Sequence, residues 1–544
     1  MKNRRPLRIG LFILLLLGWL VPFVFSKTPS QSVKGPDYGD SLIIGTIADA
    51  SLLVPMLATD AMSHIVAGNI FRGVVKYAPD LTIVGDLAER FEVSKDQRTL
   101  TFYLRKGVKW EDGVEVTAYD VEFGFKLITS PDTPSAYASD FLEVKDFKVL
   151  DRYSFRVTYK RPFALALSSW GNLVVLPKHL LAGKDLKYLQ SVFGRRPVGN
   201  GPFRFESWEP QTQIKLRFNP LNFEGRPYLD GIIYRVIPDP STLFMELRSQ
   251  GLDWISLTPL QYRKLQEESI KKDFQIYRYL AFAYTYLGYN LKEPLFQDRR
   301  VRKALCYAID KKKVVMGALL GQGIPAYGPY KPDAWFYNPA IEGSCFYNPE
   351  EALRLLKEAG FKRGKGGLLY KGGRPFEFTI LTNQGNLSRL LTAQIIQQDL
   401  ARIGIKVNIR VVEWTTLVHQ FIDKRRFQAV ILGWTTGPDP DLYDIFHSSK
   451  IQGPGLNFIG YQNKEVDRLL EEGRYTLDRE KRKKIYFRLQ EILAEDQPYT
   501  FLYIPMSLEA IHKRFRGIKP SAIGISYNLE RWWVPKGEQK YLAP

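Results

Sequence analysis

The clearest alternation of hydrophobic and polar residues lies between Pro375 and Trp434. Residues 376–381 (FEFTIL) alternate as a β-strand does, and residues 390–403 carry leucine and isoleucine at helical spacing before Gly404, a typical helix end. Residues 405–411 alternate again, and residues 428–433 form a short apolar run that suits a third strand. This order predicts a βαβ unit with a right-handed crossover.

Two loops follow the predicted strands. One is Asn383-Gln384-Gly385-Asn386 and the other is residues 433–439 (GWTTGPD). Ligands of such sheets bind beyond the carboxyl ends of the strands, and glycine lets the backbone approach a ligand closely. The same residue types dominate ordinary turns. The local pattern therefore leaves a binding loop and a plain turn equally open.

Other patterns predict scaffold. Asn348 is a helix cap followed by proline and two glutamates, and Gly360 ends that helix. Residues 100–104 alternate as a strand, and Thr117 with Asp120 forms a capping box at the start of another helix. A chain of 544 residues carrying such elements is long for one core, which predicts at least two lobes.

The N-terminus has the layout of an export signal. Four basic residues precede an apolar run over residues 9–25, and the small residue Ser26 follows. The run is slightly shorter than a membrane span needs, so residues 1–26 are predicted as a cleaved signal peptide or a retained membrane anchor. Residues 27–40, rich in Ser, Pro, Lys and Gly, are predicted as a linker. No cysteine lies nearby, which excludes attachment through a lipidated cysteine.

The chain is basic, with 77 Lys and Arg against 57 Asp and Glu and a formal charge of +20. These cations are spread along the chain with acids among them, and the densest groups, 299–313 and 479–488, have the pattern of solvated helix faces. Such a surface is typical of solubility or of attraction to anionic lipid headgroups. We therefore expect no nucleic-acid partner.

Local catalytic and metal-binding signatures are missing from the sequence. The five histidines are isolated, and there is no His-Glu-x-x-His, paired Cys-x-x-Cys, Gly-x-Ser-x-Gly or Walker-type motif. We expect no catalytic residue, no metal and no cofactor, although carboxylates brought together by folding leave acid–base chemistry open. For Cys306 and Cys345, a disulfide in an oxidising compartment and a buried thiol both stay open.

A series of short segments occurs in a fixed order from about Ser41 to the C-terminus. The segments are 85–91 (GDLAERF), 102–110 (FYLRKGVKW), 117–121 (TAYDV), 198–203 (VGNGPF), 225–230 (GRPYLD), 287–290 (LGYN), 299–305 (RRVRKAL), 348–352 (NPEEA), 460–463 (GYQN) and 465–469 (EVDRL). Taken together and in this order, they resemble the extracytoplasmic dipeptide- and oligopeptide-binding proteins of ABC importers. The order of the segments is far more specific than any one of them.

The resemblance implies an α/β fold of two lobes closing as a clamshell, with mixed sheets and two crossings between the lobes. We expect lobe I over residues 41–286, with a subdomain at about 80–205, lobe II over residues 287–506, and a return to lobe I over residues 507–544. The crossings are expected near residues 286–290 and 504–508, with Tyr289 and Asn290 as hinge residues.

In similar proteins the stretch after a Gly-Trp pair contacts a peptide. This chain departs from the family at Gly437, where an acid that anchors the peptide's amino group is expected. Asp439 is the candidate substitute, although a helix-capping role for it is equally open. The expected ligand-binding residues are Asp49, Ala50, Ser51, Asn383, Gln384, Asn386, Gly433, Trp434, Thr435, Thr436 and Asp439.

The function that the resemblance implies is capture of a peptide or peptide-like solute and delivery to the permease and ATPase subunits of an ABC importer. The protein is expected outside the cytoplasm, periplasmic or anchored on the outer face of the cytoplasmic membrane. A sugar, an opine or a metal chelate stays open as ligand. The alternatives are a membrane-anchored sensory binding protein and an exported hydrolase such as a peptidase.

Overall fold

The structure is a computed structural model and describes residues 35–171, 175–267, 269–453 and 455–541. The predicted signal or anchor, residues 1–26, lies outside these ranges, as does most of the predicted linker. Among the described residues, no helix has both the length and the apolar character that crossing a membrane requires.

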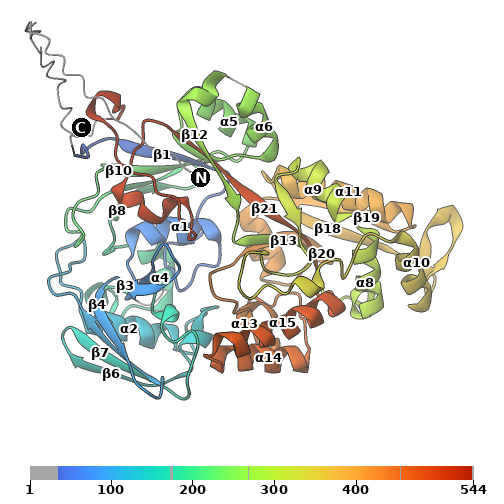
Figure 1. Cartoon of the computed structure of the whole chain (residues 1–544), viewed down its shortest axis with the longest axis horizontal. Helices are drawn as coiled ribbons and strands as arrows, with labels where there is room; N and C mark the ends of the chain where they lie inside the picture. Colours follow the sequence, from blue (N-terminus) through green and yellow to red (C-terminus); the bar gives the residue numbers. More distant parts are fainter. Residues whose placement is uncertain (1–34, 172–174, 268, 454, 542–544) are drawn as a thin grey trace, which may run out of the picture. The chain divides into compact units, whose positions relative to one another are not determined.

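A mixed sheet joins two halves of the chain through one long strand, β21 (Tyr499–His512) (Figure 1). Its first half pairs with β13 (Ala283–Tyr289) and β14 (Gly323–Pro325). Its second half pairs with β12 (Phe274–Leu280) and β11 (Trp254–Ser256). We call residues 37–280 with 506–541 lobe I, and residues 283–505 lobe II.

The chain changes lobes at two places in this strand system. It enters lobe II between Leu280 and Ala283, and it returns within β21 at Pro505 and Met506, whose partners are Gly323 and Leu280. The two expected hinge residues lie downstream of the first crossing. Tyr289 pairs with Ala429, and the Asn290 side-chain amide donates to the Phe427 carbonyl at 2.8 Å. The chain therefore passes into lobe II before it reaches Tyr289 and Asn290, because β13 is paired with β20 of lobe II along its whole length.

Lobe II contains the predicted βαβ unit. β18 (Glu377–Asn383) runs parallel to β19 (Lys406–Val412) and β20 (Ala429–Thr435), and α11 (Leu387–Arg402) connects β18 with β19. The prediction of strand, helix, strand and strand is thus confirmed. The helix begins earlier than its apolar spacing indicates, because the Asn386 side chain accepts from the Arg389 amide at 3.0 Å and caps it.

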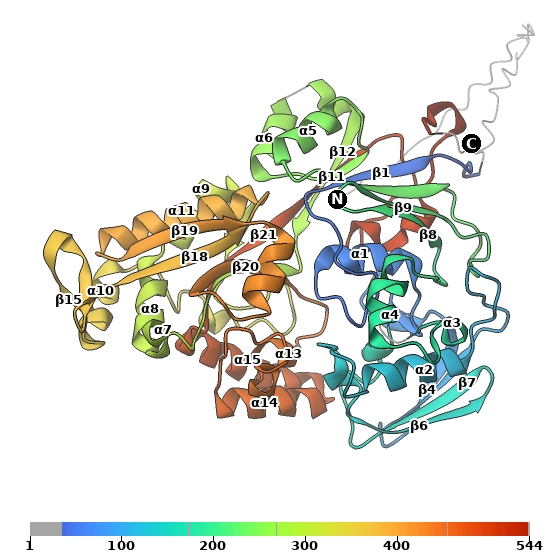
Figure 2. The same ribbon diagram turned by 180° about the vertical axis from the view of Figure 1, so that it is seen from behind.

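Lobe I carries a separate four-stranded sheet in the order β4-β5-β7-β6, with α2 (Ala118–Ile128) against it (Figure 2). Its strands are β4 (Ala88–Val93), β5 (Thr99–Leu104), β6 (Val144–Asp151) and β7 (Ser154–Tyr159). The buried Trp170 ring lies within 6.0 Å of Phe125, Phe141 and Phe155, which fixes helix and sheet together. We call this unit, residues 88–171, the subdomain.

The cores follow the same division. The largest buried cluster gathers around Trp110, Trp170 and Trp532 of lobe I. Lobe II has a cluster with Leu305, Ile380 and Ile396, and a second that is rich in aromatic residues and includes Tyr286 and Tyr499. The two strand crossings are therefore the covalent links between cores that belong to different lobes.

The C-terminal segment packs into lobe I through a buried ion cluster. The Arg514 guanidinium donates to both carboxylate oxygens of Asp253, at 2.9 and 2.7 Å, and pairs with Asp40. Asp40 also accepts from the backbone of Lys540 and Tyr541 at 3.0 Å. One arginine thus ties the start, the middle and the end of lobe I together.

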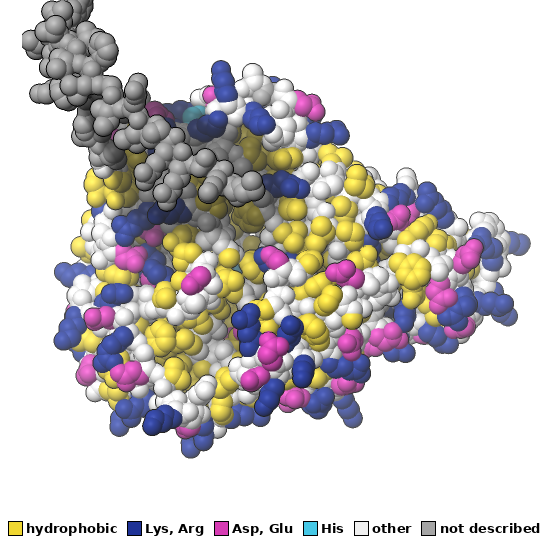
Figure 3. All heavy atoms as spheres, viewed as in Figure 1, with side chains coloured by type: hydrophobic (Ala, Val, Ile, Leu, Met, Phe, Trp, Pro, Cys, Tyr) yellow, Lys and Arg dark blue, Asp and Glu magenta, His cyan; other side chains and the backbone are white. Residues whose placement is uncertain are grey.

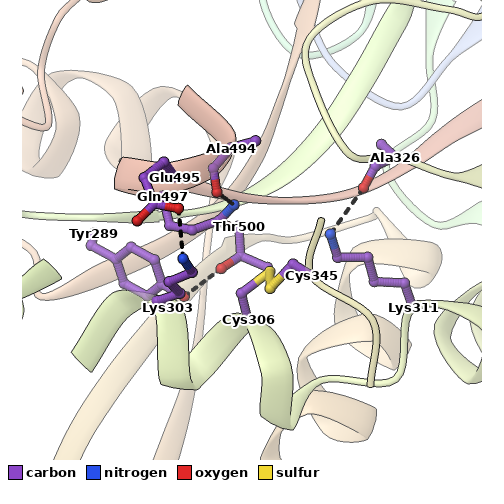
Figure 4. The surroundings of a disulfide bond; sticks show 10 residues. All are labelled: Tyr289, Lys303, Cys306, Lys311, Ala326, Cys345, Ala494, Glu495, Gln497 and Thr500. Carbon is purple, nitrogen blue, oxygen red and sulfur yellow. Dashed lines mark hydrogen bonds and ion pairs between the residues drawn. A yellow bond between two sulfur atoms is a disulfide. The ribbon is translucent and has the colours of Figure 1, made fainter. Parts of the chain in front are cut away.

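Cys306 and Cys345 form a disulfide in lobe II (Figure 4). Cys306 lies on α8 (Arg299–Ala308), Cys345 precedes α10 (Pro349–Glu358), and both are buried. The bond joins positions 39 residues apart and fastens a long connection to the lobe II core. The question that the sequence left open is thereby answered in favour of the disulfide.

A buried lysine lies close to the disulfide. Lys311 begins α9 (Lys311–Leu319), and its ammonium donates to the Ala326 carbonyl at 3.1 Å, with no carboxylate partner among the described residues (Figure 4). Burial lowers the pKa of Lys311 from 10.5 to about 7. The unfolded chain keeps this ammonium protonated up to about pH 10, so folding is penalised at neutral pH and the penalty shrinks as the pH rises.

We therefore expect Lys311→Met to raise the free energy of unfolding at pH 7 by about 2 kcal/mol, less than the full pKa shift implies because the site relaxes. Urea unfolding at pH 7 and pH 9.5 checks this. The wild type should gain stability at the higher pH and the variant should not. Lys312→Met, which changes the exposed neighbour, serves as control, and equal pH responses of Lys311→Met and wild type would contradict the expectation.

Candidate interlobe binding site

The carboxyl ends of parallel strands from both lobes face one another. In lobe II these are β18, β19 and β20, and in lobe I they are β1 (Ser41–Thr46), β10 (Gly231–Val236) and β11. Gly385, just after β18, lies so close to lobe I that a Cβ there would stand 2.8 Å from the Pro238 carbonyl oxygen and 3.8 Å from Ile47. Ligands of open α/β sheets bind at such edges. The space between these edges is the candidate site.

Arg389 is the charged group at the lobe II edge. It lies in the first turn of α11, and its guanidinium donates to the Asn383 side-chain oxygen at 2.8 Å. Within the described residues it forms no ion pair with a carboxylate. Burial lowers the pKa of Arg389, while Tyr503 and Tyr286 act in the opposite direction. An arginine that keeps its charge without a counter-ion is suited to bind an anionic group of a ligand.

Gly433 leaves the room that this guanidinium occupies. A Cβ at position 433 would lie 3.1 Å from Arg389 Nη2 and 2.9 Å from the Tyr284 carbonyl oxygen. The structure therefore brings Asn383 and Gly433, both expected site residues, together with Arg389, which the sequence analysis did not select. A signal existed: a basic residue in the first helical turn is unfavourable next to the positive end of the helix.

Trp434 points into lobe II. Its indole ring lies nearly parallel to the phenol ring of Tyr286, with the ring centroids 6.5 Å apart. The indole Nε1 donates to the Tyr499 hydroxyl at 3.3 Å. The next two residues leave this cluster: the Thr435 side chain is exposed, and the Thr436 amide donates to the Phe282 carbonyl at the crossing, at 2.8 Å. Trp434 thus supports the edge, and Thr435 is presented at it.

Asp439 already has a charged partner. Its two carboxylate oxygens accept from Arg482 at 2.6 and 2.8 Å, and Oδ1 also accepts from the Asp441 amide at 2.9 Å. Asn386 is occupied as the cap of α11, whereas the Gln384 side chain is exposed at the edge. The Asp439 charge is therefore balanced inside lobe II before any ligand arrives.

The expected lobe I residues bond within their own lobe. Asp49 accepts from Trp208 Nε1 at 3.1 Å and from the Gln211 amide at 2.9 Å. Ala50 is buried, and the Ser51 hydroxyl donates to Asp60, the cap of α1 (Ala61–Ile70). The polar side chains of Asp49 and Ser51 are therefore engaged within lobe I, and the side chain of Ile47 in the same loop approaches Gly385 of lobe II.

No metal site accompanies this edge: across the described ranges, no three His, Cys, Asp or Glu side chains are grouped so as to hold an ion. Figure 3 shows Lys and Arg side chains scattered over the visible face with Asp and Glu among them. On that face the positive charge forms no continuous stripe of the kind that follows a nucleic-acid backbone.

Comparison with known proteins gives a consistent result. The family model described as bacterial extracellular solute-binding proteins, family 5 Middle, matches residues 82–453. The chain is 35% identical to the oligopeptide-binding protein AppA of Bacillus subtilis (strain 168), over 98% of this chain and 100% of that protein.

Solved structures agree. AppA from Bacillus subtilis in complex with a nonapeptide superimposes with a TM-score of 0.87 at 34% identity, covering 92% of this chain and 100% of AppA. DppA from Helicobacter pylori in complex with the peptide STSA superimposes with a TM-score of 0.83 at 26% identity, covering 92% of this chain and 99% of DppA. NikZ from Campylobacter jejuni in complex with Ni(L-His) superimposes with a TM-score of 0.82 at 27% identity, covering 91% of this chain and 99% of NikZ.

Proposed function

The chain belongs to the bacterial extracellular solute-binding proteins of family 5, and we propose that it captures peptides between its two lobes for an ABC importer. The observation that carries the peptide ligand is the likeness to AppA, which extends over nearly the whole of both chains and includes a structure with a bound nonapeptide. The ligand would lie between the facing strand edges.

Arg389 would bind an anionic group of the peptide, its free terminal carboxylate in the first instance. The argument rests on charge: the guanidinium is held by Asn383 and lacks a carboxylate partner among the described residues. Asp439 is paired with Arg482, so the peptide amino group would rely on backbone carbonyls and exposed groups such as Thr435. Recognition would thus depend more on the carboxyl end than on the amino end.

The two crossings at residues 280–283 and 505–506 would let the lobes open and shut. Contacts made to both edges at once exist only in the closed form, so ligand binding shifts the population toward closure. The solute would be released chemically unchanged to the permease, with ATPase subunits driving its uptake. Such a protein acts outside the cytoplasm, on the periplasmic or outer side of the membrane.

A mixture of synthetic nonapeptides, prepared once with free carboxyl termini and once as amides, tests this proposal. We expect wild type to retain intact acid-form peptides in native mass spectrometry and to prefer them over amides by about 10- to 100-fold, the worth of a hydrogen bond to a charged group. Arg389→Met should bind both forms alike. Arg402→Met, at the exposed far end of α11, is the matched control.

Two results would count against the proposal. Retention of acid-form peptides by Arg389→Met with wild-type affinity would remove Arg389 from the site. Failure of wild type to retain any nonapeptide, or cleavage of the peptides during incubation, would contradict peptide capture itself and favour a non-peptide solute or a hydrolase.

A further inference from the structure

A second contact between the lobes lies away from the strand crossings. There the subdomain of lobe I meets α13 (Tyr443–Phe446) and α14 (Lys464–Tyr475) of lobe II, as both ribbon views show (Figures 1 and 2). The Ala164 amide donates to the Arg474 carbonyl at 2.7 Å, and the Ser139 hydroxyl donates to Asp444 at 2.8 Å. Both bonds cross from one lobe to the other, so they exist only while the lobes are closed.

Charged side chains that are buried or mostly buried accompany these bonds. Arg474, 3% exposed, pairs with Asp140 of lobe I and, through Nε at 3.0 Å, with Asp441 of its own lobe. Lys450 pairs with Asp444 at 2.7 Å. We call Asp140, Asp441, Asp444, Arg474 and Lys450 the latch cluster. Its three carboxylates face two cations, which leaves one negative charge in excess.

Neighbouring groups do not balance that excess. The Asp439 carboxylate and the Arg482 guanidinium, which face Asp441, neutralise each other. Five uncharged tyrosines surround the cluster: Tyr159 beside Asp140, Tyr137 beside Asp444, Tyr330 and Tyr486 beside Asp441, and Tyr443 beside Arg474 and Asp444. His447 stacks on the Tyr443 ring, and its Nε2 lies 3.3 Å from the Glu471 carboxylate. Glu471, near Tyr443, adds a further negative charge at the margin. A closed interface with this composition gains by binding a proton.

We propose that the latch cluster is a proton-linked latch, which takes up one proton as the lobes close and so favours the closed form in mildly acidic surroundings. The geometry requires both lobes: Asp140 is delivered by the subdomain, and the other four groups by lobe II. Opening the lobes removes Asp140 from Arg474 and returns it to water. The latch acts independently of the solute that the site binds.

The direction of the pH effect on lobe closure follows from the difference in the pKa of Asp140 between the closed and open forms. In the closed form, burial raises the pKa of Asp140 to about 7, Arg474 opposes the rise, and Asp444 and Asp441 add to it. Burial likewise raises the pKa of Asp441 to about 6. An exposed aspartate in the open form titrates near its ordinary value of about 4. The closed form therefore binds the proton more tightly, and closure strengthens as the pH falls from about 7 toward about 4.

Distances between the lobes test this without any peptide. Spin labels on the exposed positions 145 and 464, introduced by Lys145→Cys and Lys464→Cys, report one lobe each, and the native cysteines are already joined. By pulsed electron resonance of the ligand-free protein, the closed-to-open ratio should rise by about 10- to 30-fold from pH 8 to pH 5.5. Asp140→Asn, which removes the excess charge, should show the wild-type pH 5.5 ratio at both pH values.

The matched control is Asp146→Asn on the exposed side of β6, which should respond to pH as wild type does. A pH-independent wild-type ratio would overturn the proposal even if Asp140→Asn does not fold. So would an Asp140→Asn protein that stays open at both pH values, because the ion pair alone would then hold the lobes. Since no peptide is present, these outcomes are independent of those that test peptide capture.

Discussion

Arg514→Met is expected to lower the free energy of unfolding by about 3–5 kcal/mol at pH 7, the cost of breaking a buried ion pair by removing one partner. Arg514 is the cation that faces both Asp40 and Asp253, and the Arg514 side chain is only 2% exposed. The variant leaves two buried carboxylates without a counter-ion. Because Asp40 also holds the backbone of Lys540 and Tyr541, we expect the C-terminal segment to loosen first.

The pH dependence separates a charge effect from lost packing. Burial raises the pKa of Asp253, and Arg514 opposes the rise, so removal of Arg514 should raise this pKa further. The folded variant then gains by binding a proton that the unfolded chain releases above about pH 4. The difference in the free energy of unfolding between wild type and Arg514→Met should therefore be largest at neutral pH and should shrink as the pH falls toward 4.

Chemical unfolding of wild type and Arg514→Met at pH 7 and pH 4.5 measures both effects. The control is Arg516→Met, two residues further on, which removes an ion pair with Glu538 that is nearly half exposed on both sides. That exposed pair is worth less than about 1 kcal/mol. Equal losses in the two variants, or a loss in Arg514→Met that does not depend on pH, would contradict the role assigned to the buried cluster.

Local pattern predicted the elements of lobe II well. The alternation at residues 376–381 and 405–411, and the capping residue Asn348, depend on contacts within one element or its neighbours, and the structure contains those strands and that cap. The position of the first crossing between the lobes could not be predicted from local pattern. The motif at residues 287–290 marks a strand of lobe II, and the change of partner at residues 280–283 depends on pairing with β21, more than two hundred residues away.

The candidate site was predictable as an edge of the sheet rather than as a set of contacts. The sequence placed Asn383 and Gly433 beside it, and the structure has both against Arg389. It could not show that Asp439 is already paired with Arg482, because these residues meet only when α15 (Arg479–Asp496) packs beside α14. Polar residues in a loop indicate a site, but whether they are free depends on partners that are distant in sequence.

The second large expected effect concerns the disulfide. Replacing both cysteines in Cys306→Ala/Cys345→Ala should lower the free energy of unfolding by about 3–4 kcal/mol, because the bond restricts a loop of about 40 residues in the unfolded chain. The side chains are buried and small, so alanine keeps the packing of α8 with little loss. We expect the folded double variant to bind the same solute as wild type, since Cys306 lies on α8 and Cys345 precedes α10, and neither belongs to the strands β18, β19 and β20 whose ends form the candidate site.

A reductant provides the matched comparison. Thermal unfolding of wild type in dithiothreitol should shift down toward the midpoint of the double variant, whereas the variant's own midpoint should not respond. The same midpoint for wild type with and without reductant, and for the double variant, would mean that the bond contributes nothing to stability. A shift of wild type alone would place the stabilisation in the covalent link and not in the cysteine side chains, because both proteins share every other contact.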